Sequence, residues 1–252
     1  MDTVVPIFAT LIDGRFVPSD CARGPFGGLQ GGGVAAIVAG RIEKAAANDG
    51  KPVAVFAHFL RPVVPASPLE VAVQCVRPGK RVSIWEGSLH DVGREFARVR
   101  ITFIQQQPIA GLDVAATRAM LEDPESLPTR HWKVTQATPW LMDTMDVRGP
   151  AGGLYWIRMK RPLFDDPTVL SWILPVVDWA HGLDWTLAGW PAPIRAMPNP
   201  DIALHLLRPP QCRWLGVRPN SMHDASGIGV CQATLLDLHG VLGSVSMSIA
   251  IA

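Results

Sequence analysis

The chain has 252 residues, a formal net charge of +1 and 48% hydrophobic residues. Such a chain is too apolar for intrinsic disorder, and it lacks the basic excess that nucleic-acid binders carry. The length allows one large domain or two small ones.

The first half of the chain predicts a strand, a helix and four more strands. A short strand at Gly14–Asp20 is followed by a Gly-rich turn that ends in a helix at Gly31–Ala47, whose apolar residues recur at the helical period. Period-two alternation then predicts four strands of an antiparallel sheet, at Val53–Phe59, Leu69–Arg77, Val82–His90 and Glu95–Ile104.

The proline-rich segment Gln105–Asp146 predicts a linker, with one helix at Val114–Leu121. After a strand at Leu154–Arg161, a helix is expected to begin with Asp166 as N-cap and Pro167 at its first position.

Pro175 is expected to end or kink that helix, and a second helix at about Asp178–Leu187 is expected to take the place of the helix in the first half. Four further strands follow, at Ile202–Leu207, Trp214–Ser221, Gly229–Leu238 and Val241–Ile251.

An internal repeat relates the two halves of the sequence. The sequence HFLRP at His58–Pro62 recurs as HLLRP at His205–Pro209, 147 residues later, and the same offset relates Gly93 to Gly240 without a gap. The chain therefore reads as two copies of one α+β module. We expect modules at residues 1–110 and 147–252, joined by a linker at 111–146.

The Gly-rich turn before an Ala-rich helix, the HFLRP signature and the long meandering strands resemble the hotdog fold, and two fused copies resemble the double-hotdog acyl-CoA thioesterases. In that family a Phe-Gly-Gly-Gln motif lies in the first copy, matched here by Phe26, Gly27 and Gly28, with Leu29-Gln30 next. The resemblance implies substrate-binding roles for these three residues and for Gly31, Gly32 and Trp179.

The resemblance also implies the catalytic residues. Asp178, in the segment Leu174–Asp178, corresponds to the catalytic carboxylate, Asn199 to the second polar position, and Ser248 to a position where the family often has Gln. Because Ser is shorter than Gln, Ser248 places the activity in question more than the fold.

These residues suggest how a thioester would be cleaved. Asp178 serves as general base or nucleophile, Asn199 orients the water, and a backbone N–H near Gly31–Gly33 or after Asp178 polarises the carbonyl. At the expected start of a helix, the Asp178 carboxylate would be stabilised by the helix dipole. Gly31 lies opposite Asp178 in the repeat, so we expect one working and one degenerate site per chain.

Several alternatives stay open at this point. Asp178 is an N-cap and Asn199 a turn residue in the simplest structural interpretation. Arg61 and Arg208 are expected to pair with carboxylates, with phosphate binding as the alternative. A non-catalytic acyl-CoA-binding or scaffold protein is a second function, and a hydratase using Asp178 and His181 is a third.

The remaining expectations concern partners and compartment. Four widely spaced cysteines without a CxxC indicate neither a zinc site nor a disulfide framework, so we expect reduced thiols and no metal or cofactor. Met1–Thr10 does not resemble a signal peptide, and no apolar stretch reaches the ~20 residues of a membrane span. We expect a cytoplasmic homodimer or higher homo-oligomer that acts on acyl-CoA, without nucleic acid or membrane.

Overall fold

The computed structural model describes residues 8–64, 68–111, 121–133, 139–150, 153–189 and 191–252. Its centre is one ten-stranded antiparallel sheet in the order β4-β5-β6-β3-β9-β12-β11-β10-β8-β7, beside a two-stranded hairpin, β1-β2. The strands are β1 (Ala9–Ile12), β2 (Arg15–Pro18), β3 (Lys51–Phe59), β4 (Glu70–Arg77), β5 (Val82–Asp91), β6 (Arg94–Ile104), β7 (Met145–Arg148), β8 (Tyr155–Met159), β9 (Asp201–Leu206), β10 (Leu215–His223), β11 (Ile228–Asp237) and β12 (Gly240–Ala250).

The repeat is visible in the middle of the sheet. The two strands that carry the repeated signature, β3 and β9, pair directly and antiparallel, with Val55 opposite Leu204 and Ala57 opposite Ile202. On one side of the β3–β9 junction lie β3, β6, β5 and β4, and on the other side lie β9, β12, β11, β10, β8 and β7. The α+β class predicted from the sequence is confirmed, and the strands expected from the two copies belong to one continuous sheet.

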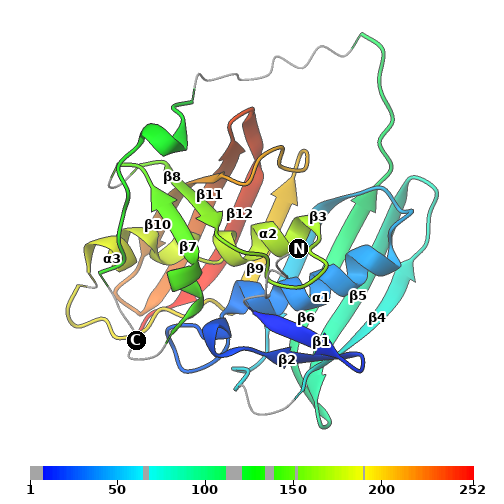
Figure 1. The fold of residues 1–252 in the computed structure, drawn as a ribbon, viewed down its shortest axis with the longest axis horizontal. Coiled ribbons are helices and arrows are strands. Elements are labelled where there is room, and N and C mark those ends of the chain that lie inside the picture. Colours follow the sequence, from blue (N-terminus) through cyan, green and yellow to red (C-terminus); the bar gives the residue numbers. More distant parts are fainter. Residues whose placement is uncertain (1–7, 65–67, 112–120, 134–138, 151–152, 190) are drawn as a thin grey trace, which may run out of the picture.

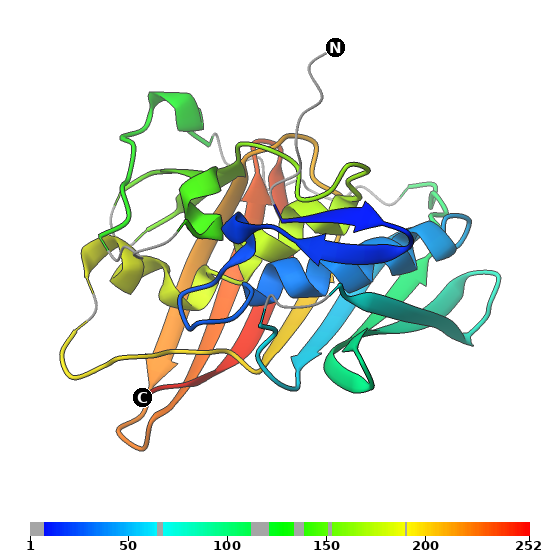
Figure 2. The same cartoon turned by 60° about the horizontal axis from the view of Figure 1, so that its bottom comes forward.

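The helices lie on one face of this sheet. Helix α1 (Gly31–Ala45) and helix α2 (Val169–Val177) pack against each other, and the β1-β2 hairpin covers α1 on the side away from the sheet (Figures 1 and 2). Helix α3 (Leu183–Ala188) follows α2 after a short 3₁₀ turn, η4 (Ala180–Gly182). Three more 3₁₀ turns are η1 (Asp20–Ala22), η2 (Pro124–Ser126) and η3 (Leu141–Thr144).

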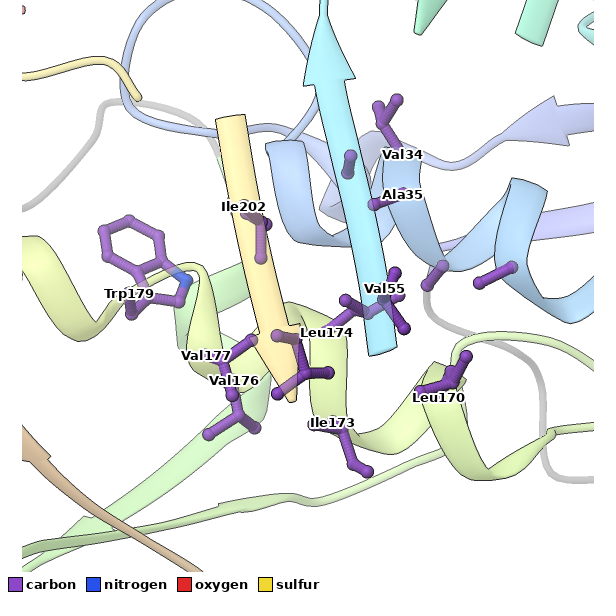
Figure 3. Close-up of a cluster of buried hydrophobic side chains, with 14 of the residues drawn as sticks. Val34, Ala35, Val55, Leu170, Ile173, Leu174, Val176, Val177, Trp179 and Ile202 are labelled. Carbon is purple, nitrogen blue, oxygen red and sulfur yellow. The ribbon is translucent and has the colours of Figure 1, made fainter. Parts of the chain in front are cut away.

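The core forms between the two helices and the central strands. Figure 3 shows Val34 and Ala35 of α1, Val55 of β3, Ile202 of β9 and Leu174 of α2 gathered in one buried cluster. Inward residues of the strands alternate with exposed ones, as at β9, where Ile202, Leu204 and Leu206 are buried. Burial of this apolar surface is the main contribution to the stability of the pair of modules.

The helix of the second module differs from the expectation. The first turn begins after Thr168, not after Asp166, and α2 continues through Pro175 to Val177. Pro175 lies near the end of the helix, where its missing N–H removes one hydrogen bond while Asp178 N still donates to the carbonyl oxygen of Leu174 at 3.1 Å. Asp178 is therefore the C-cap of α2, and the expected helix at 178–187 is replaced by η4 and α3.

The connection between the modules adds structure that the sequence did not predict. Strand β7 pairs with β8 at the edge of the sheet, although its first two residues, Met145 and Asp146, lie in the segment assigned to the linker. The helix expected at Val114–Leu121 falls, except for Leu121, outside the described residues. The module limits themselves stay a prediction.

Candidate active site

A cavity of about 330 Å³ opens where three segments of the chain meet. They are the first turn of α1, the C-terminal end of α2 and the loop that precedes β9. Apolar side chains such as Val34, Phe59 and Met197 form much of its wall. Asp178, Asn199 and His181 also line it, so the cavity combines an apolar wall with a few polar groups, as small-molecule sites commonly do.

The carboxylate of Asp178 is buried at this meeting point. It lies at the end of its own helix, where the dipole disfavours a negative charge, but directly against the first turn of α1, where the dipole favours one. The Gly32 N–H donates to it. The helix dipole that the sequence analysis assigned to a helix beginning at Asp178 thus comes from the other module.

Gln30 joins the two helix ends through its side-chain amide. As N-cap of α1, its Oε1 accepts a hydrogen bond from the N–H of Gly33 at 2.6 Å. Its Nε2 donates to Asp178 Oδ2 at 2.7 Å and to the carbonyl oxygen of Pro175 at 3.1 Å. Because Pro175 lies in the last turn of α2, its carbonyl has no partner within the helix, and Gln30 satisfies it.

Asn199 holds the other carboxylate oxygen. Its Nδ2 donates to Asp178 Oδ1 at 2.8 Å and to the carbonyl oxygen of Asp201 at 3.2 Å. The prolines on either side are fixed to the sheet, since Ala250 N donates to the Pro198 carbonyl at 2.9 Å and Phe59 N to the Pro200 carbonyl at 2.8 Å. Both amide hydrogens of Asn199 are thereby used, which leaves its Oδ1 as an acceptor.

Burial governs the titration of the two ionisable groups here. It raises the pKa of Asp178, while the nearby His181, Asn199 and the Gly32 N–H oppose the rise. Burial also lowers the pKa of His181, whose Nε2 donates to the carbonyl oxygen of Met197 at 2.9 Å. A raised pKa suits a carboxylate that takes a proton from water near neutral pH.

The first turn of α1 offers a further donor. Gly31 lines the cavity, and within the described residues its N–H has no acceptor, as expected at the first position of a helix. A Cβ at Gly31 would stand 3.1 Å from the ring of Phe59 and 3.3 Å from Asp178 Oδ1. Glycine therefore keeps this N–H close to both the carboxylate and the cavity.

The structure brings most of the residues singled out by the sequence to this place. Asp178, Asn199, Phe26, Gly28, Gly31 and Trp179 line the cavity. Gly32 lies just behind it, against Asp178. Gly27 adopts a positive φ of 80° in the turn and is not among the described residues that line the cavity.

Ser248 is not brought to the cavity. Its side chain is exposed on β12, and it is not among the described residues that line the cavity. Its backbone N–H donates to Asp201 Oδ1 at 2.9 Å, so its visible contact is with the start of β9.

Gln30 is the polar residue that the sequence analysis quoted without assigning it a role. Gln is not among the residues preferred as N-caps, so its place before the helix gave no capping signal. Its bonds to Pro175 and Asp178 span 145 and 148 residues, so no local pattern could have revealed them.

Two features are absent from the described residues. No group of three or more His, Cys, Asp or Glu is placed to hold a metal ion in this part of the chain. Among the same residues, no helix is long and apolar enough to cross a membrane.

Comparisons with known proteins bear on the first module and on the fold. Residues 18–119 match the family model of the acyl-CoA thioesterase N-terminal domain. No curated protein matches the chain significantly.

Solved structures share the whole fold at low sequence identity. A protein assigned as a thioesterase from Novosphingobium aromaticivorans superposes with a TM-score of 0.74 at 19% identity, covering 98% of this chain and 99% of that one. A conserved protein of unknown function with a hot dog fold from Alicyclobacillus acidocaldarius gives 0.74 at 15% identity, with 96% and 94% covered. An acyl-CoA thioesterase II from Mycobacterium marinum gives 0.67 at 18% identity, with 89% and 90% covered.

These similarities cover both modules, whereas the family model covers the first. The resemblance stated from the sequence is confirmed for the first module and for the fold. The first module matches the acyl-CoA thioesterase N-terminal domain, and the chain as a whole has the double-hotdog fold of the thioesterase II type.

Proposed function

We propose that this protein hydrolyses an acyl-CoA thioester to a free acid and CoA, with Asp178 as general base. The observation that carries the proposal is the buried carboxylate of Asp178, held by Gln30 and Asn199 against the first turn of α1 in an apolar cavity. The family match of the first module supports acyl-CoA thioesterase activity in general.

The reaction uses groups that already lie together. A water that donates to Asp178 and to the free Oδ1 of Asn199 attacks the thioester carbon while Asp178 takes its proton. The N–H of Gly31 donates to the carbonyl oxygen as negative charge develops on it. When the tetrahedral intermediate collapses, the C–S bond breaks and the CoA sulfur receives the proton from Asp178, which restores the carboxylate.

The roles of the remaining residues follow from their positions. Gln30 fixes the carboxylate, since its amide hydrogens are both used by Asp178 and Pro175. Phe26, Gly28 and Trp179 contribute wall to the cavity and are assigned to substrate binding. Ser248 receives no step, because its side chain is exposed away from the described cavity wall.

The decisive experiment measures thiol release from a panel of acyl-CoA substrates by wild type and by Asp178→Asn. Asp178→Asn keeps the size of the side chain but cannot take a proton, so hydrolysis is expected to fall at least roughly 1,000-fold with the fold retained. Circular dichroism and the unfolding midpoint control for folding. Full activity in the variant, or no thiol release by wild type from any substrate, would refute the proposal.

A hydratase is the second candidate, because His181 lines the same cavity beside Asp178. The imidazole is committed at Nε2 to the Met197 carbonyl, so only Nδ1 is left for chemistry. Addition of water to an enoyl-CoA without thiol release would favour this function. Binding of CoA with neither reaction would favour a non-catalytic binding protein.

The setting of the reaction is also part of the proposal. We place the protein in the cytoplasm, as a homodimer or higher homo-oligomer acting in lipid metabolism without a cofactor. All four cysteines, Cys21, Cys75, Cys212 and Cys231, are free thiols, which suits a reducing compartment.

A further inference from the structure

The internal repeat places two arginines in equivalent positions with different surroundings. Arg208 and Arg61 each precede a proline just after the end of a central strand, β9 and β3 respectively, 147 residues apart. Equivalent residues in two copies of one module are expected to make equivalent contacts, so a difference between them points to a difference in role.

Arg208 is part of the structure of the second module. Its guanidinium makes a two-pronged ion pair with Asp237 at the end of β11, with Nη–Oδ distances of 2.7 and 2.5 Å. Asp237 is fully buried, and it also accepts hydrogen bonds from the N–H groups of Gln211 and His239. Despite burial, Arg208 keeps the pKa of Asp237 below its usual range.

Arg61 makes no such pair. The 147-residue offset places His90 opposite Asp237, so the repeat gives Arg61 no equivalent carboxylate. The neighbouring Asp91, the last residue of β5, forms its ion pair with Arg94 at 3.7 Å. Within the described residues, the exposed side chain of Arg61 has no hydrogen bond or ion pair, and its influence on Glu95 is a longer-range one, since Glu95 is bound by Arg98 at 2.8 Å.

Arg61 lies instead at the cavity that holds Asp178. It is the only Lys or Arg among the described residues that line this cavity, and its neighbours Leu60 and Pro62 line it too. A cavity of about 330 Å³ is at the small end of ligand sites, which span about 300–1,000 Å³. It has room for an acyl group and a thioester, so the nucleotide of a CoA substrate must lie outside, past the exposed rim.

We propose that Arg61, released from the structural pairing kept by Arg208, binds a phosphate group of CoA at the mouth of the active-site cavity. This rests on the proposed function, because CoA is the substrate that carries such phosphates. A guanidinium binds phosphate oxygens through a planar fork of N–H groups, and phosphate needs no neighbouring carboxylate to be displaced here.

Direct titration calorimetry tests the assignment without any turnover. The ligands are CoA, dephospho-CoA and pantetheine, and the proteins are wild type, Arg61→Gln and Arg218→Gln. Arg218 is exposed on β10 and is not among the cavity-lining residues, so the control loses the same charge elsewhere. Arg61→Gln is expected to weaken CoA binding roughly tenfold, from the loss of a hydrogen bond to a charged group, and to leave pantetheine binding and the unfolding midpoint unchanged.

Each outcome decides the point. A weakened affinity for CoA in Arg61→Gln alone supports the assignment. If the defect persists with dephospho-CoA the contact is to the diphosphate, and if it disappears the contact is to the 3′-phosphate. Equal CoA affinity of Arg61→Gln and wild type, an equal loss with pantetheine, a like loss in Arg218→Gln, or no CoA binding by wild type would overturn it. CoA binding that depends on Arg61, found in a protein that hydrolyses no thioester, would refute the proposed function and leave this inference standing.

Discussion

Helix α1 touches α2 through a glycine, and this contact yields the sharpest stability prediction. A Cβ at Gly32 would stand 2.3 Å from the carbonyl oxygen of Leu174 and 2.7 Å from the Cβ of Asp178. Both are fixed parts of α2, so Gly32→Ala must push the helices apart. Gly40, in the same helix, provides the control, because the nearest atom to its Cβ would be Thr168 Oγ1 at 3.6 Å, an ordinary contact.

Both substitutions change the helix propensity, but only one of them introduces a steric clash. Replacing glycine by alanine within a helix favours folding by about 1 kcal/mol at either position. Overpacking costs about 1–3 kcal/mol and applies only at Gly32. Gly40→Ala is therefore expected to stabilise the protein by up to about 1 kcal/mol. The free energy of unfolding of Gly32→Ala is expected to be about 1–3 kcal/mol lower than that of Gly40→Ala.

The same displacement should reach the active site. Gly32 N–H donates to Asp178, so moving α1 away from α2 separates the carboxylate from the first-turn donors. A shift of about 1 Å at a catalytic group can cost about 100-fold in rate. Urea unfolding and kcat/KM for acyl-CoA hydrolysis, measured on both variants, give the comparison. Gly32→Ala with the stability of Gly40→Ala and full activity would show that the helices do not depend on this close contact.

Further predictions concern the charges at the two helix ends. The carboxylate of Glu43 accepts a hydrogen bond from Leu170 N at 3.1 Å, and burial raises the pKa of Glu43 from 4.5 to about 7. Between pH 4.5 and 7, the folded protein therefore holds a proton that the unfolded chain has lost. The free energy of unfolding should therefore fall as the pH rises from 4.5 to 7. Glu43→Gln should remove this pH dependence and stabilise the protein at pH 8 by up to about 3 kcal/mol. An unchanged dependence of the unfolding free energy on pH in the variant would contradict this. Gln30→Glu places a second carboxylate beside Asp178, which should raise the pKa of Asp178 and move the acidic limb of the kcat–pH profile to higher pH. An unmoved acidic limb would count against the contact between residue 30 and Asp178. Asn199→Ala removes a donor to Asp178 and an acceptor for water, so kcat should drop about 100-fold with a smaller change in KM; a change in KM alone would assign Asn199 to binding.

The sheet was predictable because its signals are local and repeated. Alternation placed the four strands of each module within one or two residues at most of their ends, and the 147-residue repeat placed β3 and β9 in equivalent positions before any contact was known. The cavity location followed from the family resemblance through Asp178 and Asn199. The bonds that shape the site were not predictable, because the partners of Gln30 lie 145 and 148 residues away in the sequence.

The difference at α2 has two sources. The gapless repeat places the second helix at Asp178, but the repeat holds for the strands and not for the helices, and α2 begins at Val169. In the sequence, Pro175 is expected to end or kink the helix, although near the C-terminal end of a helix a proline removes a single hydrogen bond. The carboxylate then moves from the start of a helix to its end, and its favourable dipole must come from a partner helix.

Antiparallel packing of α1 and α2 explains how that partner is supplied, and why the chain has an asymmetric pair of sites. At one end, the first turn of α1 contacts Asp178, the C-cap of α2. At the other end, the first turn of α2 contacts Glu43, in the last turn of α1. Each helix thus offers a carboxylate to the N-terminus of the other. The described cavity with Asn199 and the rim residue Arg61 lies at the first end, whereas Glu43 is engaged by the N–H of Leu170. The helix packing therefore places a carboxylate at the N-terminus of each helix, and the surroundings of Asp178 make one of the two a candidate catalytic site.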